Sequence, residues 1–217
     1  MKVTFHKVLL KKRFPLAISR GVHGDTYNVF VRFEKDGVVG WGESAPGKNE
    51  GAKTPDLVIS ELQKLIKTNI EDKSIYEIEN IAREILISPC SYAGLDIALC
   101  DWKSKKANIP LYNLFVLSLP KTKTSVTLGI MSPESAKERI PLLFDGSSAK
   151  HLKVKLGSPK GIEADKRMYS QVLESIKPYN ISLRVDANGG WNIENAKHMI
   201  EWLSKRECDY VEQPLAE

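Results

Sequence analysis

Residues 151–156 read HLKVKL and residues 182–188 read SLRVDAN, and these two stretches decide the fold. In each of them charged residues alternate with aliphatic ones, which is the two-residue period of a β-strand. Lys153 and Lys155 therefore share one face of the first strand, and Asp186 lies on the charged face of the second. The aliphatic faces require a covering layer. The pattern predicts two strands that pack against helices and carry charges on their other face.

Strands and helices alternate regularly on both sides of these stretches. Strands are predicted at residues 124–130, 151–156, 181–186 and 209–212, and helices at residues 132–144, 160–177 and 193–205. Such alternation is typical of a parallel sheet or of a (β/α)₈ barrel. The pattern contains three complete units and a fourth strand, whereas a closed barrel has eight units. We therefore expect an incomplete (β/α) TIM-type barrel over residues 116–217.

The first part of the chain begins with a different pattern, in which strands follow one another. Residues 2–13 and 27–33 predict strands, with a polar and flexible loop at residues 19–25 between them. Asp36-Gly37 is a strong signal for a tight hairpin turn. A returning strand is therefore expected directly after this turn.

Helical patterns follow this predicted hairpin. They lie at residues 54–69, 74–87 and 91–107. Thr54 is suited to the N-cap of the first helix, and Pro55 to its first helical position. Residues 1–115 are thus predicted to form an α+β domain. The whole chain combines an α+β domain with an α/β domain.

Charged residues on the barrel strands predict a site at one rim. The residues concerned come from three strands and lie toward their carboxyl ends: Lys153, Lys155, Asp186 and Glu212. Catalytic residues of barrels gather at the carboxyl ends of the strands. Burying an unpaired charge is costly, so charged residues at this place need a partner or a function. Two carboxylates on neighbouring strands also suit Mg²⁺, which prefers oxygen ligands. A buried ion-pair network, or a Rossmann-like sheet with polar strand ends, is the alternative that the pattern leaves open.

Five motifs of the chain resemble signatures of the muconate-lactonizing subgroup of the enolase superfamily. They are KVK (153–155), VDANGGW (185–191), VEQPL (211–215), GVVGWGE (37–43) and GLDIALCD (94–101). The last two resemble the capping domain of these enzymes, in which Trp usually stands at the place of Cys100. The resemblance implies an N-terminal enolase-like capping domain followed by a TIM-type barrel.

The resemblance also implies a reaction, the abstraction of a proton α to a carboxylate through an enediolate intermediate. It implies that Lys155 is the general acid/base on one face of the α-carbon and that Lys153 supports it. Asp186 and Glu212 are then ligands of Mg²⁺, which stabilises the enediolate together with the lysine charge. A second ammonium group nearby is expected to lower the pKa of a lysine toward neutral pH.

Within this subgroup the chain is most similar to dipeptide epimerases of the L-Ala-D/L-Glu type. The similarity lies in residues 19–21 and 124–130. It implies that Arg20 contacts a carboxylate of a substrate such as L-Ala-L-Glu. Thr127 and Asn188 are the other candidate substrate-binding residues.

Part of such a site is expected to lie outside this sequence. The resemblance implies a second lysine and a third carboxylate on later strands, and the sequence ends at Glu217. We therefore expect the chain alone to lack epimerase activity and to bind Mg²⁺ weakly. Alternatives that stay open are o-succinylbenzoate synthase or muconate cycloisomerase activity, a non-catalytic truncated remnant, and a pairing of two chains as half-barrels.

The sequence patterns make a cytoplasmic protein the default, and the resemblance implies a small-molecule dipeptide substrate. The net charge is +5, but lysines are interspersed with acidic residues along helical stretches, which is typical of solvated helix faces and does not require nucleic acid. No apolar run approaches the roughly 20 residues of a membrane span, and no signal-peptide pattern is present. We expect no nucleic-acid or membrane partner, and a homo-oligomer for the full-length form.

Overall fold

The computed structural model of the chain describes residues 1–216, which form two compact units. The N-terminal unit comprises Met1–Lys11 and Asp25–Leu119. The barrel unit comprises Lys12–Gly24 and the chain from Pro120 onward. A short segment from early in the sequence therefore belongs to the unit that carries the charged rim.

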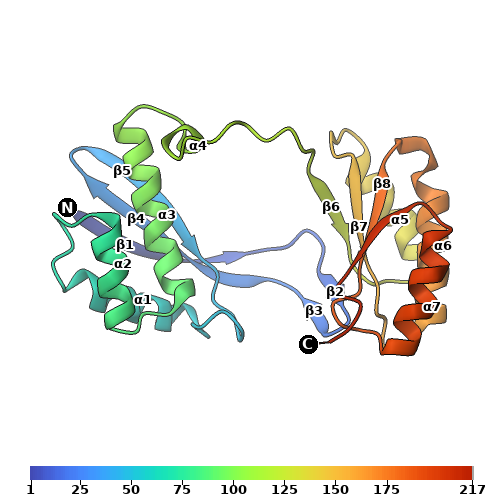
Figure 1. The fold of residues 1–217 in the computed structure, drawn as a ribbon. Helices are drawn as coiled ribbons and strands as arrows, with labels where there is room; N and C mark the ends of the chain where they lie inside the picture. The colour runs from blue at the N-terminus through green and yellow to red at the C-terminus, as the bar shows by residue number, and fades with distance from the viewer. Residues whose placement is uncertain (217) are drawn as a thin grey trace. The chain divides into compact units, whose positions relative to one another are not determined.

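An antiparallel sheet organises the N-terminal unit. It contains β1 (Lys2–Leu10), β4 (Thr26–Lys35) and β5 (Val38–Ser44), in the order β1-β4-β5 (Figure 1). Asp36 and Gly37 connect β4 to β5, with φ angles of 55° and 73°. Positive φ at both central residues is the requirement of the commonest two-residue hairpin turn. The predicted hairpin is confirmed.

Helices cover one face of this sheet. α1 (Pro55–Ile66) and α3 (Pro89–Lys106) pack on the strands, whereas α2 (Ile75–Glu84) and the short α4 (Leu111–Leu114) pack on α3. The Thr54 side chain accepts a hydrogen bond from the backbone N–H of Leu57, which confirms the predicted N-cap. Gly42 of β5 and Gly94 of α3 let the two backbones meet, because a Cβ on Gly42 would lie 1.9 Å from the Gly94 carbonyl oxygen.

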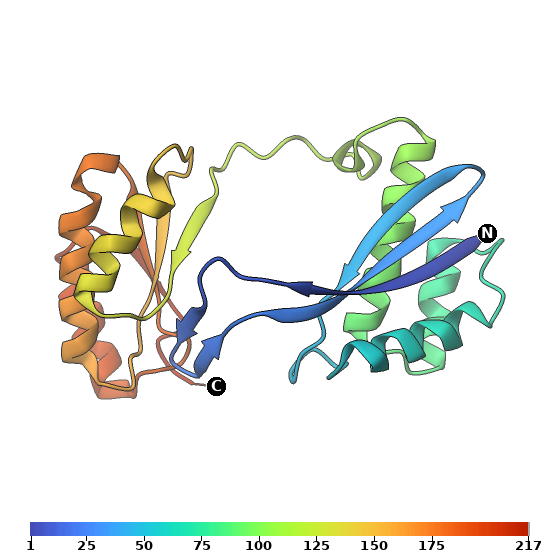
Figure 2. The same cartoon turned by 180° about the vertical axis from the view of Figure 1, so that it is seen from behind.

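A parallel sheet organises the barrel unit. Within residues 1–216 it contains β6 (Ser125–Leu128), β7 (His151–Lys155), β8 (Ser182–Asp186) and β9 (Cys208–Glu212), in that order. The connecting helices are α5 (Pro133–Phe144), α6 (Ile162–Ile176) with the 3₁₀ turn Lys177–Tyr179, and α7 (Ile193–Ser204). Figures 1 and 2 show these helices on the same side of the sheet. The predicted βα alternation is confirmed.

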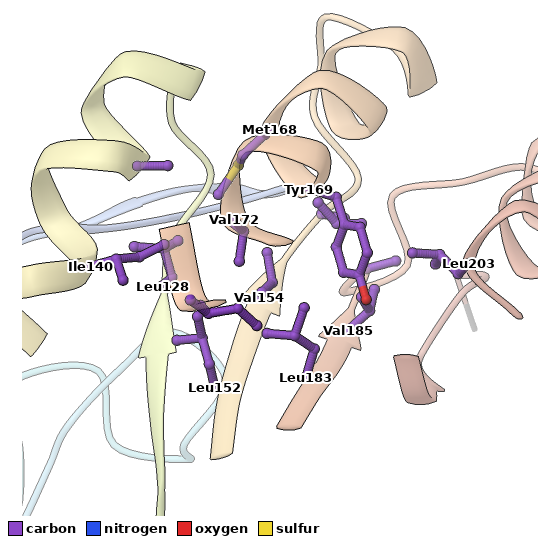
Figure 3. Close-up of a cluster of buried hydrophobic side chains, with 14 of the residues drawn as sticks. Leu128, Ile140, Leu152, Val154, Met168, Tyr169, Val172, Leu183, Val185 and Leu203 are labelled. Atoms are coloured by element: carbon purple, nitrogen blue, oxygen red, sulfur yellow. The ribbon is translucent and has the colours of Figure 1, made fainter. Parts of the chain in front are cut away.

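The core of the barrel unit lies between this sheet and its helices. Figure 3 shows aliphatic side chains of β6, β7 and β8 meeting side chains of α5, α6 and α7. Leu152, Val154, Leu183 and Val185 are fully buried there, as the two-residue period predicts. The charged residues between them are left on the opposite face. None of the helices described in residues 1–216 is long and apolar enough to cross a membrane.

Residues 19–25 were predicted as a flexible loop, but most of them belong to a hairpin. β2 (Leu16–Ile18) and β3 (Gly21–His23) form an antiparallel hairpin whose turn consists of Ser19 and Arg20. The hairpin packs on the barrel unit after β6, where the backbone N–H of Ile130 donates to the Ala17 carbonyl oxygen at 2.8 Å. A Cβ on Gly129 would lie 2.9 Å from the Ala17 nitrogen, so a glycine here allows the close approach.

Candidate active site

Strand register brings the charged residues to one rim of the parallel sheet. Lys155 is the Cα partner of Asp186, and Asp186 is the Cα partner of Glu212. One row below, Thr127 pairs with Lys153, which pairs with Arg184. Since parallel strands end at the same edge, the upper row lies at the carboxyl end of the sheet.

Both lysines are paired with carboxylates. Lys155 Nζ lies 2.6 Å from Asp186 Oδ2, and the two side chains are 13% and 2% exposed. Lys153 Nζ lies 2.5 Å from Glu212 Oε2, and these side chains are 24% and 39% exposed. Lys153 reaches past β8 to make this contact, because β7 and β9 are not neighbours in the sheet. The structure therefore brings together the four residues on which the sequence prediction rested.

The carboxylates, and not the neighbouring ammonium group, dominate the electrostatics of Lys153. Its hydrogen bond to Glu212 raises the pKa of Lys153 above the ordinary value, and partial burial acts in the opposite direction. The charge of Asp186 adds to the rise. The pKa of Lys153 is therefore raised, and not lowered as a second like charge alone would predict.

Asn188 follows β8 and holds the buried carboxylate of Asp186. Its backbone N–H donates to Asp186 Oδ1 at 2.8 Å, and its Nδ2 donates to Asp186 Oδ2 at 3.4 Å. Asn188 has a φ of 46°, which turns the chain sharply after the strand. Among the described residues the buried Oδ1 of Asn188 has no hydrogen-bond partner. Asp186 is therefore fixed by Lys155 from one strand and by Asn188 from its own loop.

Arg20 lies exposed in the turn of the β2–β3 hairpin. The adjacent Ser19 fixes this turn, because its Oγ donates to the carbonyl oxygen of Asn188 at 2.9 Å. Thr127 is exposed on β6, in the row of Lys153. Substrate contacts by Arg20, Thr127 and Asn188 remain predictions, but one hydrogen bond now connects the Arg20 turn to the Asp186 loop.

Below the rim, the same face of the sheet is polar. The guanidinium carbon of Arg184 lies 5.5 Å from the centre of the Tyr210 ring, and His151 Nδ1 lies 2.6 Å from Ser182 Oγ. Within residues 1–216 the buried Nε of Arg184 has no hydrogen-bond partner. Branched apolar side chains normally fill this position in barrels. The rim thus continues downward into a polar layer.

Sequence reasoning missed Asp165, a buried carboxylate in the first turn of α6. Its oxygens accept hydrogen bonds from the backbone N–H groups of Gly157 (3.0 Å) and Ser158 (2.9 Å) and from Trp191 Nε1 (2.9 Å). Burial raises the pKa of Asp165, and the three donors act against this rise. An acidic residue in a first helical turn is common, so the sequence contains no distinctive signal for this role.

Asp186 and Glu212 are the candidate ligands for a metal ion. They supply hard oxygen donors from neighbouring strands, which is the donor type that Mg²⁺ prefers. In the part of the chain that the structure describes, no group of three or more His, Cys, Asp or Glu side chains could hold a metal. The two carboxylates fit Mg²⁺ in type, and a bound cation would compete with the two lysines for them.

Comparison with known families gives two matches that together cover most of the chain. Residues 1–115 match the N-terminal domain of mandelate racemase / muconate lactonizing enzyme, and residues 137–217 match an enolase C-terminal domain-like family. The first match includes every strand and helix of the N-terminal unit. The second match begins inside α5 and includes β7, β8 and β9.

Curated relatives are named as dipeptide epimerases. A hydrophobic dipeptide epimerase of Flavobacteria bacterium (strain MS024-2A) is 57% identical over 217 residues, which is all of this chain and 62% of the relative. A hydrophobic dipeptide epimerase of Roseobacter litoralis is 44% identical over 215 residues, which is 99% of this chain and 62% of the relative. The chain therefore spans less than two thirds of the length of either relative.

Crystal structures of dipeptide epimerases have the same fold. The enzyme of Cytophaga hutchinsonii, complexed with Mg and D-Ala-L-Val, gives a TM-score of 0.84 at 26% identity, over 99% of this chain and 58% of that chain. The enzyme of Enterococcus faecalis V583, complexed with Mg and L-Leu-L-Tyr, gives 0.83 at 28% identity, over 99% of this chain and 60% of that chain.

Proposed function

The chain belongs to the mandelate racemase / muconate lactonizing enzyme family of the enolase superfamily, and on this premise we propose that its charged rim is part of a dipeptide epimerase site. The observation that carries the proposal is the pairing of Lys155 with Asp186 and of Lys153 with Glu212 at one rim. Removing a proton α to a carboxylate requires a positioned base and positive charge near the developing enediolate. The rim supplies groups of both kinds.

Lys155 is the proposed acid/base on one face of the substrate α-carbon. In its neutral form its Nζ takes the α-proton, and in its charged form it returns a proton to the same face. The side chain is mostly buried and is fixed by Asp186, so its position is defined before substrate arrives. Lys153 adds positive charge beside it and holds Glu212 in place.

Asp186 and Glu212 are the proposed holders of Mg²⁺. When bound, the cation supplies positive charge that stabilises the negative charge developing on the substrate carboxylate. Asn188 orients Asp186 through two hydrogen bonds. Carboxylates that bind metal ions are usually held by such hydrogen bonds from a neighbouring residue. The presence of Mg in the complexes of two dipeptide epimerases of the same fold supports this assignment.

Epimerisation also requires a proton donor on the opposite face of the α-carbon. In the described chain, strands β6 to β9 carry no lysine besides Lys153 and Lys155, and both project from β7. We therefore expect the 217-residue chain alone to leave the configuration of a dipeptide unchanged.

The proposed substrates are dipeptides with apolar side chains. The two relatives that are 57% and 44% identical to this chain over the aligned residues are named for hydrophobic dipeptides, and this supports the choice over o-succinylbenzoate synthase or muconate cycloisomerase activity. A second candidate is an acidic dipeptide such as L-Ala-L-Glu. It is favoured by one observation, the exposed Arg20 in the turn of a hairpin that is anchored to the rim.

A fusion protein tests both candidates. The chain is joined to the part of the Flavobacteria relative that lies outside the matched 62%, which completes the length of that relative. Chiral chromatography then follows the conversion of L-Leu-L-Tyr and L-Ala-L-Glu with Mg²⁺ present. We expect faster conversion of L-Leu-L-Tyr. Preference for L-Ala-L-Glu that is lost in Arg20→Ala would establish the second candidate, and a folded fusion that converts neither dipeptide would contradict the proposed function.

A further inference from the structure

Three loops of the barrel unit meet beside the charged rim. The first follows β7 and contains Gly157, and the second follows β8 and contains Asn188 and Gly190. The third is the turn of the β2–β3 hairpin, with Ser19. A Cβ on Gly190 would lie 2.6 Å from Gly157 Cα and 2.8 Å from Ser19 Cβ, so the loops touch one another almost without intervening side chains.

Packing between glycines does not fix the relative position of these loops. Glycine has no side chain to interlock, and Gly157 has a φ of 80°, which few other residues adopt. The loops therefore need directional contacts to hold them in register.

Asp165 supplies these contacts to two of the three loops. One carboxylate oxygen accepts from Gly157 N–H and from Trp191 Nε1, and the other accepts from Ser158 N–H. Asp165 and Trp191 are both buried, so water cannot replace these bonds easily. The β7 loop and the β8 loop are thus tied to one buried carboxylate in α6.

The β8 loop also connects to the candidate site through the hydrogen bonds of Asn188. Asn188 donates to Asp186, the proposed metal ligand, and accepts from Ser19, the neighbour of Arg20. A displacement of this loop would move the Asp186 carboxylate and the Arg20 turn together.

We infer that Asp165 is a positioning residue that sets the β8 loop, and through Asn188 fixes both Asp186 and the substrate-facing hairpin. The roles of Asp186 as a metal ligand and of Arg20 as a substrate contact rest on the proposed function. The hydrogen bonds that connect their positions do not depend on it. Asp165 touches neither Asp186 nor Arg20 and acts through Trp191, Gly157 and Asn188.

The Asp165→Asn variant tests the coupling. All three neighbours of the carboxylate are N–H donors, so an amide nitrogen in place of either oxygen faces a donor and loses its bond. We expect the Trp191 Nε1 proton to exchange faster in NMR. We also expect the ratio of tryptic cleavage after Arg20 to cleavage after Lys205 to rise about tenfold, because loss of a bond of this strength opens the hairpin locally.

Matched variants separate positioning from loss of stability. Glu163→Gln removes an exposed carboxylate from the same helix turn, and we expect no change in either measurement. Met199→Ala weakens the core of the same unit, and raises cleavage after Arg20 and Lys205 in parallel. Ser19→Ala cuts the coupling at its other end, so the cleavage ratio rises while Trp191 exchange is unchanged.

The result that overturns the inference is an Asp165→Asn variant with the wild-type cleavage ratio, or a Met199→Ala variant with an equal rise. Trp191→Phe removes one of the three donors and provides the same test if Asp165→Asn does not fold. These measurements need no turnover, so they remain decisive if the fusion protein proves inactive. In an active fusion, Asp165→Asn is expected to raise KM for the dipeptide more than Ser158→Ala, which keeps the backbone donor.

Discussion

Replacing Lys155 by methionine should destabilise the barrel unit far more than the same replacement at Lys153. Lys155 Nζ lies 2.6 Å from an almost completely buried Asp186, so its loss leaves a carboxylate without its cation away from water. Breaking a buried pair in this way costs about 3–5 kcal/mol. Asn188 still donates to Asp186, so we expect a loss near the lower limit, about 3 kcal/mol.

Lys153 provides the matched comparison on the same strand. Its pair with Glu212 is equally short, but both side chains keep substantial contact with water. Pairs of this kind contribute about 0–1 kcal/mol. The expected difference between Lys155→Met and Lys153→Met is therefore about 2 kcal/mol or more.

Hydrogen exchange mass spectrometry at increasing urea concentrations, in metal-free buffer, measures this difference. Peptides from β7 and β8 report the barrel unit separately from the N-terminal unit. The double variant Lys155→Met/Asp186→Asn removes the stranded charge and should recover most of the loss. Equal losses for Lys155→Met and Lys153→Met, or no recovery in the double variant, would refute the reasoning.

Two further predictions concern packing and pH. Gly190→Ala places a Cβ 2.6 Å from Gly157 Cα and 2.8 Å from its carbonyl oxygen. It should lower the free energy of unfolding, measured in urea, by about 1–3 kcal/mol. Gly24→Ala, whose Cβ has no atom within 4 Å, should leave the free energy of unfolding unchanged. Burial and the charge of Glu79 raise the pKa of Asp96, so the folded state holds this proton more tightly than the unfolded state and loses stability as pH rises above 3.8. Asp96→Asn should remove this loss, and urea midpoints from pH 3.8 to neutrality that fall equally in both proteins would contradict it.

Local periodicity was sufficient to predict the strands and to predict which of their side chains lie on the face opposite the helices. HLKVKL and SLRVDAN alternate without interruption, and a strand with a two-residue period has only one way to bury its aliphatic face. Once Lys155 and Asp186 are placed at equivalent ends of neighbouring parallel strands, their pairing follows from register.

The partner of Lys153 could not be predicted in the same way. Its neighbour in register is Arg184, with a like charge, and the lysine instead reaches across β8 to Glu212. The ion-pair partner of a long side chain depends on its length and rotamer, and the two-residue period of a strand predicts neither the rotamer nor the partner. This choice also explains why the pKa of Lys153 is raised although two other cations are near.

Contacts between distant segments were also beyond the sequence. Residues 19–25 were predicted as a flexible loop, yet residues 19–23 belong to a hairpin that pairs with the chain after β6 through Ala17 and Ile130. Asp165 has the sequence appearance of an ordinary acidic residue in a first helical turn. Its importance comes from Trp191, which lies 26 residues further along the chain.

Exchange of the α-proton in D₂O is the most direct measurement of the proposed chemistry. With the completed fusion and Mg²⁺, ¹H NMR should show the α-proton signal of L-Leu-L-Tyr disappearing. General acid/base groups contribute about 10²–10⁴-fold to such steps, so Lys155→Ala should slow the exchange by a factor in this range. Lys177→Ala, at an exposed position beyond α6, should leave the rate unchanged. An undiminished exchange rate in Lys155→Ala would contradict the assignment of the rim as the place where the proton is removed.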